Sequence, residues 1–253
     1  TGNRHHPIRF SVGSRVTTIN VNAVEPAGAT LTIGETGDTV KVNDSVNVNT
    51  VKDAGGNTLW VSNGSGVLSS VSGFGDALVL LSTQTPSGAT EVEFTSLIDS
   101  SYVEYIFKFI TINPATDSSY LVFNGSSDGG DNYNVEKTST FFSAEHGWDA
   151  SSYDFSYRTS YDLAEGAGFQ YMTGPMGNDA SANVAAELHL YNPSSTTYVK
   201  NWMGSANMYH NADYMARYYF AGYFNTTSAI DAMKFYMSDS GAFDGIIKMY
   251  GVK

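Results

Sequence analysis

The sequence predicts an all-β protein, and three features indicate this class. Seventeen Tyr and fourteen Phe supply side chains that pack well on pleated sheets. Charged residues make up only 15% of the chain, so its polarity comes mainly from Ser, Thr, Asn and Gly, which favour turns over long solvated helices. Short runs of alternating apolar and polar residues recur between turn signals, as in strands with one buried face. Residues 180–186 are the one stretch where a helix is considered.

The N-terminal region, residues 1–94, is predicted to be a β-rich attachment or oligomerisation region built of short strands. Residues 29–34, 38–42 and 45–49 alternate in period two, and turn signals such as Gly55-Gly-Asn57 follow closely. Strands this short bury little surface by themselves. We therefore expect either a small sandwich or a repetitive segment that neighbouring chains complete.

The C-terminal region, residues 95–253, is predicted to be an antiparallel β-sandwich of jelly-roll type. Its strongest strand is residues 101–112, in which Val103, Tyr105, Phe107 and Phe109 share an apolar face expected to line the core. Residues 126–132 are expected to form a hairpin tip, because Asp-Gly and Gly-Gly favour tight turns. The other predicted strands are residues 120–124, 133–138, 187–191, 198–203, 218–224, 231–237 and 245–250.

Charge and composition exclude several classes of partner and cofactor. The net charge is −12 and no Lys/Arg cluster is present, whereas a nucleic-acid partner requires a basic face. No cysteine is present, which excludes disulfides, thiolate catalysis and cysteine-based zinc sites. No apolar run approaches the roughly 20 residues that span a bilayer, so no membrane insertion is expected. No cofactor is predicted.

Two acidic segments suggest chemistry, but neither predicts a catalytic or metal site. The five histidines form no HExxH motif, and no Gly-x-Ser-x-Gly elbow occurs between a strand and a helix. Glu145-His-Gly-Trp-Asp149 gathers two acids and an imidazole, which a metal site or a glycan-cleaving acid/base pair would use. We favour a polar loop between strands, with Trp148 packed onto the sandwich. Asp128-Gly-Gly-Asp-Asn132 offers calcium ligands, but a turn is the favoured interpretation.

An aromatic stretch between residues 148 and 171 raises the hypothesis of a carbohydrate site. Flat rings with nearby carboxylates and amides suit a sugar platform. The same rings also suit a sandwich core or a subunit interface, and this second interpretation is favoured. The Tyr- and Met-rich residues 202–223 are likewise assigned to core packing or subunit contact. The residues proposed for glycan or interface contact are Trp148, Asp149, Tyr153, Tyr157, Arg158 and Tyr161.

Several segments of the chain resemble a family of phage proteins. The segments are residues 187–200, 221–231 and 245–253, together with 96–100, 112–117 and 128–134. They resemble the C-terminal domain of structural proteins from tailed phages of marine bacteria, often labelled tail-fibre or capsid-surface proteins. The resemblance covers residues 28–253. It implies a virion component, often multimeric, and it does not imply a catalytic site.

Two functions follow as hypotheses. The first is a non-enzymatic structural protein on the virion surface: a capsid decoration, a head fibre or a tail-fibre component. It would contact other virion proteins and form a homo-oligomer, with a trimer favoured by the short N-terminal strands and by family habit. The alternative is a receptor-binding adhesin that recognises host cell-surface glycan. An exposed aromatic groove flanked by carboxylates would favour the adhesin, and aromatics buried between subunits would favour the structural element.

Overall fold

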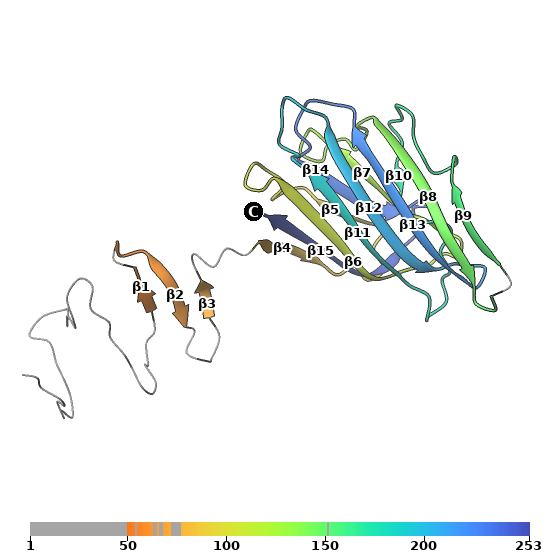
Figure 1. The fold of residues 1–253 in the computed structure, drawn as a ribbon, viewed down its shortest axis with the longest axis horizontal. Coiled ribbons are helices and arrows are strands. Elements are labelled where there is room, and N and C mark those ends of the chain that lie inside the picture. Colours follow the sequence, from red (N-terminus) through yellow and green to blue (C-terminus); the bar gives the residue numbers. More distant parts are fainter. Residues whose placement is uncertain (1–49, 54, 63–64, 66–67, 72–76, 151) are drawn as a thin grey trace, which may run out of the picture. The chain divides into compact units, whose positions relative to one another are not determined.

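The computed structural model describes residues 50–53, 55–62, 65, 68–71, 77–150 and 152–253. The chain divides into two compact units, residues 1–73 and 74–253 (Figure 1). The strands predicted at 29–34, 38–42 and 45–49 lie outside the described residues. Over the described ranges every regular element is a strand, so the all-β prediction is confirmed. The same ranges contain no helix of the length and apolarity that a membrane span requires.

The N-terminal unit contains a small antiparallel sheet. Its strands are β1 (Thr50–Lys52), β2 (Thr58–Ser62) and β3 (Leu68–Val71), in the order β1-β2-β3. The predicted turn at 55–57 joins β1 to β2 and is held by Asp53, whose carboxylate accepts the Asn57 backbone N–H at 2.8 Å and the Asn57 amide Nδ2 at 3.0 Å. Such a hydrogen bond to a side chain satisfies a backbone N–H group of the turn locally.

The C-terminal unit is a β-sandwich of two antiparallel sheets that pack face to face (Figure 1). One sheet has four strands in the order β10-β7-β14-β5, and the other has eight in the order β4-β15-β6-β11-β12-β13-β8-β9. The jelly-roll arrangement in particular stays a prediction. The strands are β4 (Leu78–Gln84), β5 (Glu91–Phe94), β6 (Glu104–Pro114), β7 (Leu121–Ser126), β8 (Lys137–Gly147), β9 (Tyr153–Tyr157), β10 (Gln170–Tyr171), β11 (Val184–Tyr191), β12 (Lys200–Tyr209), β13 (Tyr214–Phe224), β14 (Ala232–Met237) and β15 (Phe243–Val252).

Aromatic rings from both sheets fill the core. Phe235 of β14 lies with its ring centroid 5.0 Å from that of Phe107 and 4.9 Å from that of Phe109, both on β6. Phe123 of β7 meets Trp202 of β12 edge-on at 5.0 Å. Edge-to-face contacts of this kind add to the free energy gained by burying the rings. The contacts join the four-stranded sheet to the middle of the eight-stranded one.

The period-two pattern correctly assigned most of the core face of β6. Tyr105, Phe107 and Phe109 are buried, as predicted. Val103 is a correction: β6 begins only at Glu104, and Val103 precedes it with 66% of its surface exposed. Alternation gives the face of each residue within a strand, but it does not fix the residue at which pairing starts.

Other boundaries differ from the prediction for reasons of strand pairing. Residues 180–186 form no helix; Val184 begins β11. The strand expected at 133–138 begins only at Lys137 and continues to Gly147 as β8. The second compact unit comprises residues 74–253, whereas the predicted C-terminal region begins at residue 95; residues 74–94 belong with this unit because β4 pairs with β15 and β5 pairs with β14.

The hairpin expected at residues 126–132 is also wrong. β7 and β8 belong to different sheets, so this segment crosses from one sheet to the other. It still turns, because Asp128 accepts hydrogen bonds from the Ser126 hydroxyl at 2.6 Å and the Asn132 backbone N–H at 2.9 Å. These bonds lower the pKa of the Asp128 carboxyl, since they stabilise its charged form. The crossing brings the end of β7 close to the start of β8.

Candidate functional site

The candidate site lies on the outer face of the eight-stranded sheet. Along β12 the side chains alternate, so that Trp202 and Met208 point into the core while Asn201, Met203 and Asn207 are exposed. β11 and β13 flank β12 on either side, and both alternate in the same way. Each of the three strands thus presents one row of side chains on the outer face of the sheet.

Four shallow, open hollows lie in a row along β12 on this face, and we call this row the groove. Their volumes are about 390, 310, 290 and 350 Å³. The first and second hollows share Met203, the second and third share Glu187, and the third and fourth share Asn207. At about 3.4 Å per residue, the outward positions from Asn201 to Tyr209 extend over about 27 Å. The groove is long enough for an extended ligand.

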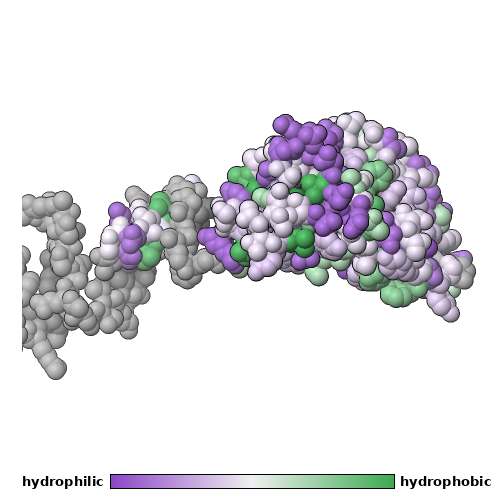
Figure 2. Space-filling model, turned by 90° about the horizontal axis from the view of Figure 1, so that it is seen from above, coloured by the Kyte–Doolittle hydropathy of each residue, from purple (hydrophilic) through white to green (hydrophobic). Residues whose placement is uncertain are grey.

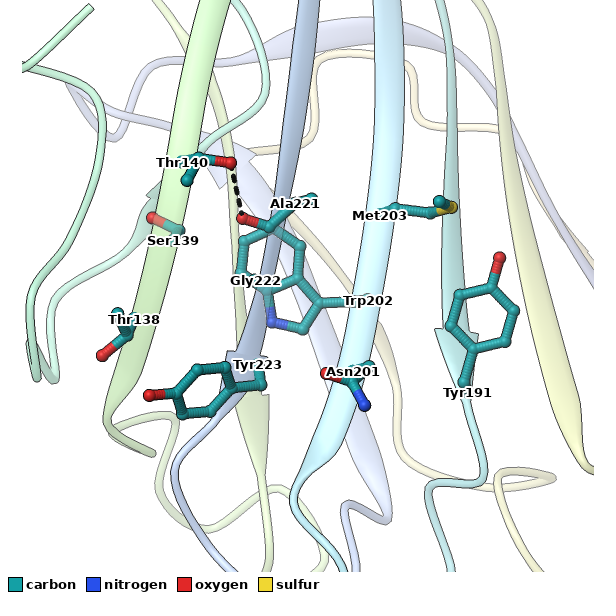
Figure 3. A pocket seen from close by; sticks show the side chains of 10 residues that line it. All are labelled: Thr138, Ser139, Thr140, Tyr191, Asn201, Trp202, Met203, Ala221, Gly222 and Tyr223. Atoms are coloured by element: carbon teal, nitrogen blue, oxygen red, sulfur yellow. Dashed lines mark hydrogen bonds between the residues drawn. The ribbon is translucent and has the colours of Figure 1, made fainter.

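The first hollow lies between two tyrosines (Figure 3). Tyr191 of β11 stands on one side, and Tyr223 of β13 stands on the other. Gly222 lets the core ring of Trp202 come close under β13: a Cβ at this position would lie 2.6 Å from Trp202 Cζ2 and 2.4 Å from the Thr138 carbonyl oxygen. The Thr140 hydroxyl donates to the Ala221 carbonyl at 3.5 Å across the same hollow. Trp202 therefore packs closely beneath the first hollow, and Tyr191 and Tyr223 flank it.

The second hollow combines stacked rings with a polar network. Tyr219 and Phe142 are nearly parallel, with centroids 5.0 Å apart and an interplanar angle of 17°. Facing them on β11, Glu187 lies 3.6 Å from the Lys108 ammonium. His189 Nδ1 is 2.6 Å from the Glu104 carboxylate. Ring faces thus occupy one wall and ionisable groups the other.

These side chains suit a ligand with both apolar faces and many hydroxyls. Aromatic faces pack against the C–H face of a sugar ring, and amides and carboxylates fix the orientation of hydroxyl groups. Amides from Asn201 and Asn207 border the groove. Within the described part of the chain no group of three His, Asp or Glu side chains is placed to hold a metal ion. The arrangement supports binding of a carbohydrate chain.

The structure separates the six residues that the sequence proposed for this role. Trp148 and Asp149 lie in the turn after β8, while Tyr153 and Tyr157 lie on the edge strand β9. Trp148 is 84% exposed, so it does not pack onto the sandwich as expected. The polar loop expected from Glu145 begins only at Trp148, because β8 extends to Gly147. Tyr153 is also 84% exposed.

The last two of the six residues lie elsewhere. Arg158 Nη2 lies 2.5 Å from the Glu145 carboxylate and 3.0 Å from that of Asp154, so an ion-pair network holds it on the face opposite Tyr153. Tyr161 packs its ring 5.2 Å from Phe141 and 5.0 Å from Tyr171 at the core. Burial raises the pKa of the Tyr161 phenol well above its usual value. Neither side chain joins a sugar platform at β9.

Several groove residues belong to the stretch 202–223, for which the sequence predicts core packing or subunit contact. Tyr219, Tyr223 and Met203 fall in the Tyr- and Met-rich stretch 202–223. The signal that could have separated them is the alternation itself: odd-numbered positions of β12 and β13 face outward. Alternation does not tell which of the two faces stays open, because that depends on the side on which the four-stranded sheet packs.

Comparisons with known proteins place the chain in no family. No family model matches it. No curated protein and no solved structure matches it either. The functional conclusion therefore depends on the residues and the geometry above.

Proposed function

We propose that this chain is a non-catalytic surface component of a phage virion whose C-terminal sandwich binds host cell-surface glycan. The observation that carries the binding role is the row of hollows along β12, with tyrosines beside it and amide and carboxylate groups at its borders. An extended oligosaccharide presents alternating hydroxyl edges and apolar ring faces, and this groove offers a partner for each.

A binding role is favoured over hydrolysis by the position of the carboxylates. Most glycoside hydrolases use two carboxyl groups that flank the scissile bond. In the second hollow the carboxylate comes from Glu187, and the Lys108 ammonium lies 3.6 Å away. Glu104, on the next strand, is engaged by His189. These contacts suit carboxylates that accept hydrogen bonds from a bound ligand.

The virion assignment is supported by the resemblance of residues 187–200, 221–231 and 245–253 to tailed-phage structural proteins. We include in the proposal a homo-oligomer, with a trimer favoured, whose partners are other virion proteins. The eight-stranded sheet ends in β4 and β9, which expose Leu80 and Phe155. Edge strands that expose apolar side chains are common sites of chain–chain contact. On the face seen in Figure 2, hydrophobic residues form separate patches among hydrophilic ones.

The virion assignment is tested by gold labelling of intact particles with an antibody raised against residues 95–253. Label over the head indicates a capsid decoration or head fibre, and label on the tail indicates a tail-fibre component. Particles without any label would overturn the assignment. The glycan-binding role would then have to stand on the groove alone.

Replacing Tyr219 with alanine is expected to weaken oligosaccharide binding about tenfold or more, which corresponds to about 1.4 kcal/mol or more. The change removes the ring that stacks with Phe142 on the wall of the second hollow. The measurement is calorimetric titration of wild type and variant with a panel of neutral and acidic oligosaccharides from bacterial envelopes.

The matched control is Tyr153→Ala, which removes an exposed tyrosine from β9 outside the groove. We expect this variant to bind as tightly as wild type. If Tyr153→Ala loses binding while Tyr219→Ala keeps it, the site lies at the β9 edge. If no oligosaccharide or envelope polysaccharide binds wild type at millimolar concentration, the glycan role is wrong.

A further inference from the structure

A lysine and an asparagine from opposite sheets meet inside the sandwich. Lys137 begins β8 in the eight-stranded sheet, and Asn124 lies in β7 of the four-stranded sheet. Lys137 is fully buried and Asn124 is 3% exposed. Lys137 Nζ lies 2.6 Å from Asn124 Oδ1. An amine and a carboxamide are thus held in contact across the core and away from water.

The surroundings of Lys137 favour a neutral amine. Among the described residues no carboxylate forms an ion pair with Lys137; its Nζ instead donates to the Val135 carbonyl at 2.7 Å. The Phe224 ring centroid is 5.7 Å from Nζ. Burial lowers the pKa of this lysine to about 7, because a buried ammonium loses its hydration. A lysine amine is nucleophilic only in its neutral form, which is well populated here near neutral pH.

The carboxamide of Asn124 is fixed at both of its ends. The Gly125 backbone N–H donates to Oδ1 at 3.0 Å, while Nδ2 donates to the Tyr133 carbonyl at 2.6 Å. Gly125 allows this close packing, since a Cβ there would lie 2.7 Å from the Phe224 ring. A backbone N–H on a carbonyl oxygen stabilises the negative charge that develops there during attack.

We propose that Lys137 and Asn124 form an isopeptide bond that links the two sheets. Rotation about the Cε–Nζ bond turns the amine lone pair toward Asn124 Cγ. The Nζ–Cγ bond forms, the Cγ–Nδ2 bond breaks, and one proton passes from Nζ to the departing nitrogen, which leaves as ammonia. The product is a secondary amide, and no oxidant or other reactant is consumed. In a chain without cysteine, this bond supplies the covalent link between sheets that a disulfide cannot.

The test is mass spectrometry of the full chain under denaturing conditions, after incubation at pH 8. We expect a mass lower than that of the sequence by one ammonia, and a branched proteolytic peptide that joins the segments containing Asn124 and Lys137. A wild-type chain at its full sequence mass, without a branched peptide, would overturn the proposal. This measurement needs no variant to fold.

Three variants assign the bond to its atoms. Lys137→Met and Asn124→Ala should each abolish both the branched peptide and the loss of ammonia. Lys200→Met is the matched control, because Lys200 is also fully buried but its Nζ contacts only the backbone carbonyls of Tyr198 and Thr226. The Lys200→Met variant should retain the bond. Loss of ammonia that persists in both Lys137→Met and Asn124→Ala would place the reaction elsewhere and contradict the proposal.

Discussion

Replacing Phe235 with alanine is expected to lower the free energy of unfolding by about 3–5 kcal/mol, as is typical of a buried Phe. Phe235 is fully buried on β14, and its ring contacts Phe94, Phe107 and Phe109 from two other strands. Truncation leaves a cavity between the sheets that these rigid neighbours cannot close. Urea denaturation of wild type and variant measures the difference.

The matched control is Trp148→Ala, which removes an even larger aromatic side chain that is 84% exposed in the turn after β8. Exposed substitutions of this kind usually change stability by no more than about 0.5 kcal/mol. A loss for Trp148→Ala as large as that for Phe235→Ala would show that Trp148 packs onto the sandwich. The placement of the turn after β8 would then be wrong.

The free energy of unfolding is expected to fall in acid, and part of this fall is due to protonation of His210. Its side chain is 7% exposed and stacks on Tyr214 with centroids 3.9 Å apart, while its Nδ1 accepts the Ala212 backbone N–H at 3.1 Å. Burial, and to a lesser extent the Arg158 cation, lowers the pKa of His210 to about 4, against a smaller opposing effect of Asp117. Protonation of Nδ1 would also break the bond from Ala212.

The direction of the pH effect on the free energy of unfolding depends on whether the folded or the unfolded chain binds the proton first. Below pH 6.5 the unfolded chain protonates His210 while the folded chain does not, so the free energy of unfolding falls as the pH drops toward 4. A depression from 6.5 to about 4 corresponds to about 3 kcal/mol, all of it lost below pH 4. We expect His210→Asn, whose amide oxygen can still accept from Ala212, to lack this part of the acid sensitivity.

The measurement compares denaturation curves of wild type and His210→Asn at pH 7 and pH 4. The stability of wild type relative to the variant should fall by about 3 kcal/mol between the two pH values. His146→Asn serves as the control, because His146 is exposed on the outer face of β8. An unchanged difference between wild type and His210→Asn at the two pH values would mean that His210 is hydrated in the folded protein.

Local pattern determined the strand content and much of the core. The alternation of residues 104–109 fixed which rings of β6 face inward, because successive side chains of a strand point to opposite faces. Seven of the eight strands predicted between residues 95 and 253 match β6, β7, β11, β12, β13, β14 and β15, with shifted bounds. Strand ends such as that at Val103 were missed because pairing partners, and not propensity, decide where a ladder begins.

The packing of the two sheets against each other determines the candidate sites. Met203 and Trp202 are adjacent apolar residues on β12, and only the docking of the four-stranded sheet on one face leaves Met203 in an open groove and Trp202 in the core. Likewise, residues 126–132 look like a hairpin locally, yet they cross between sheets and set Lys137 against Asn124. Periodicity and composition alone predicted the two faces of the strands and excluded disulfides and thiolate chemistry. Which face stays open and which polar groups meet depend on how the two sheets pack against each other, and no local pattern in the sequence reveals that packing.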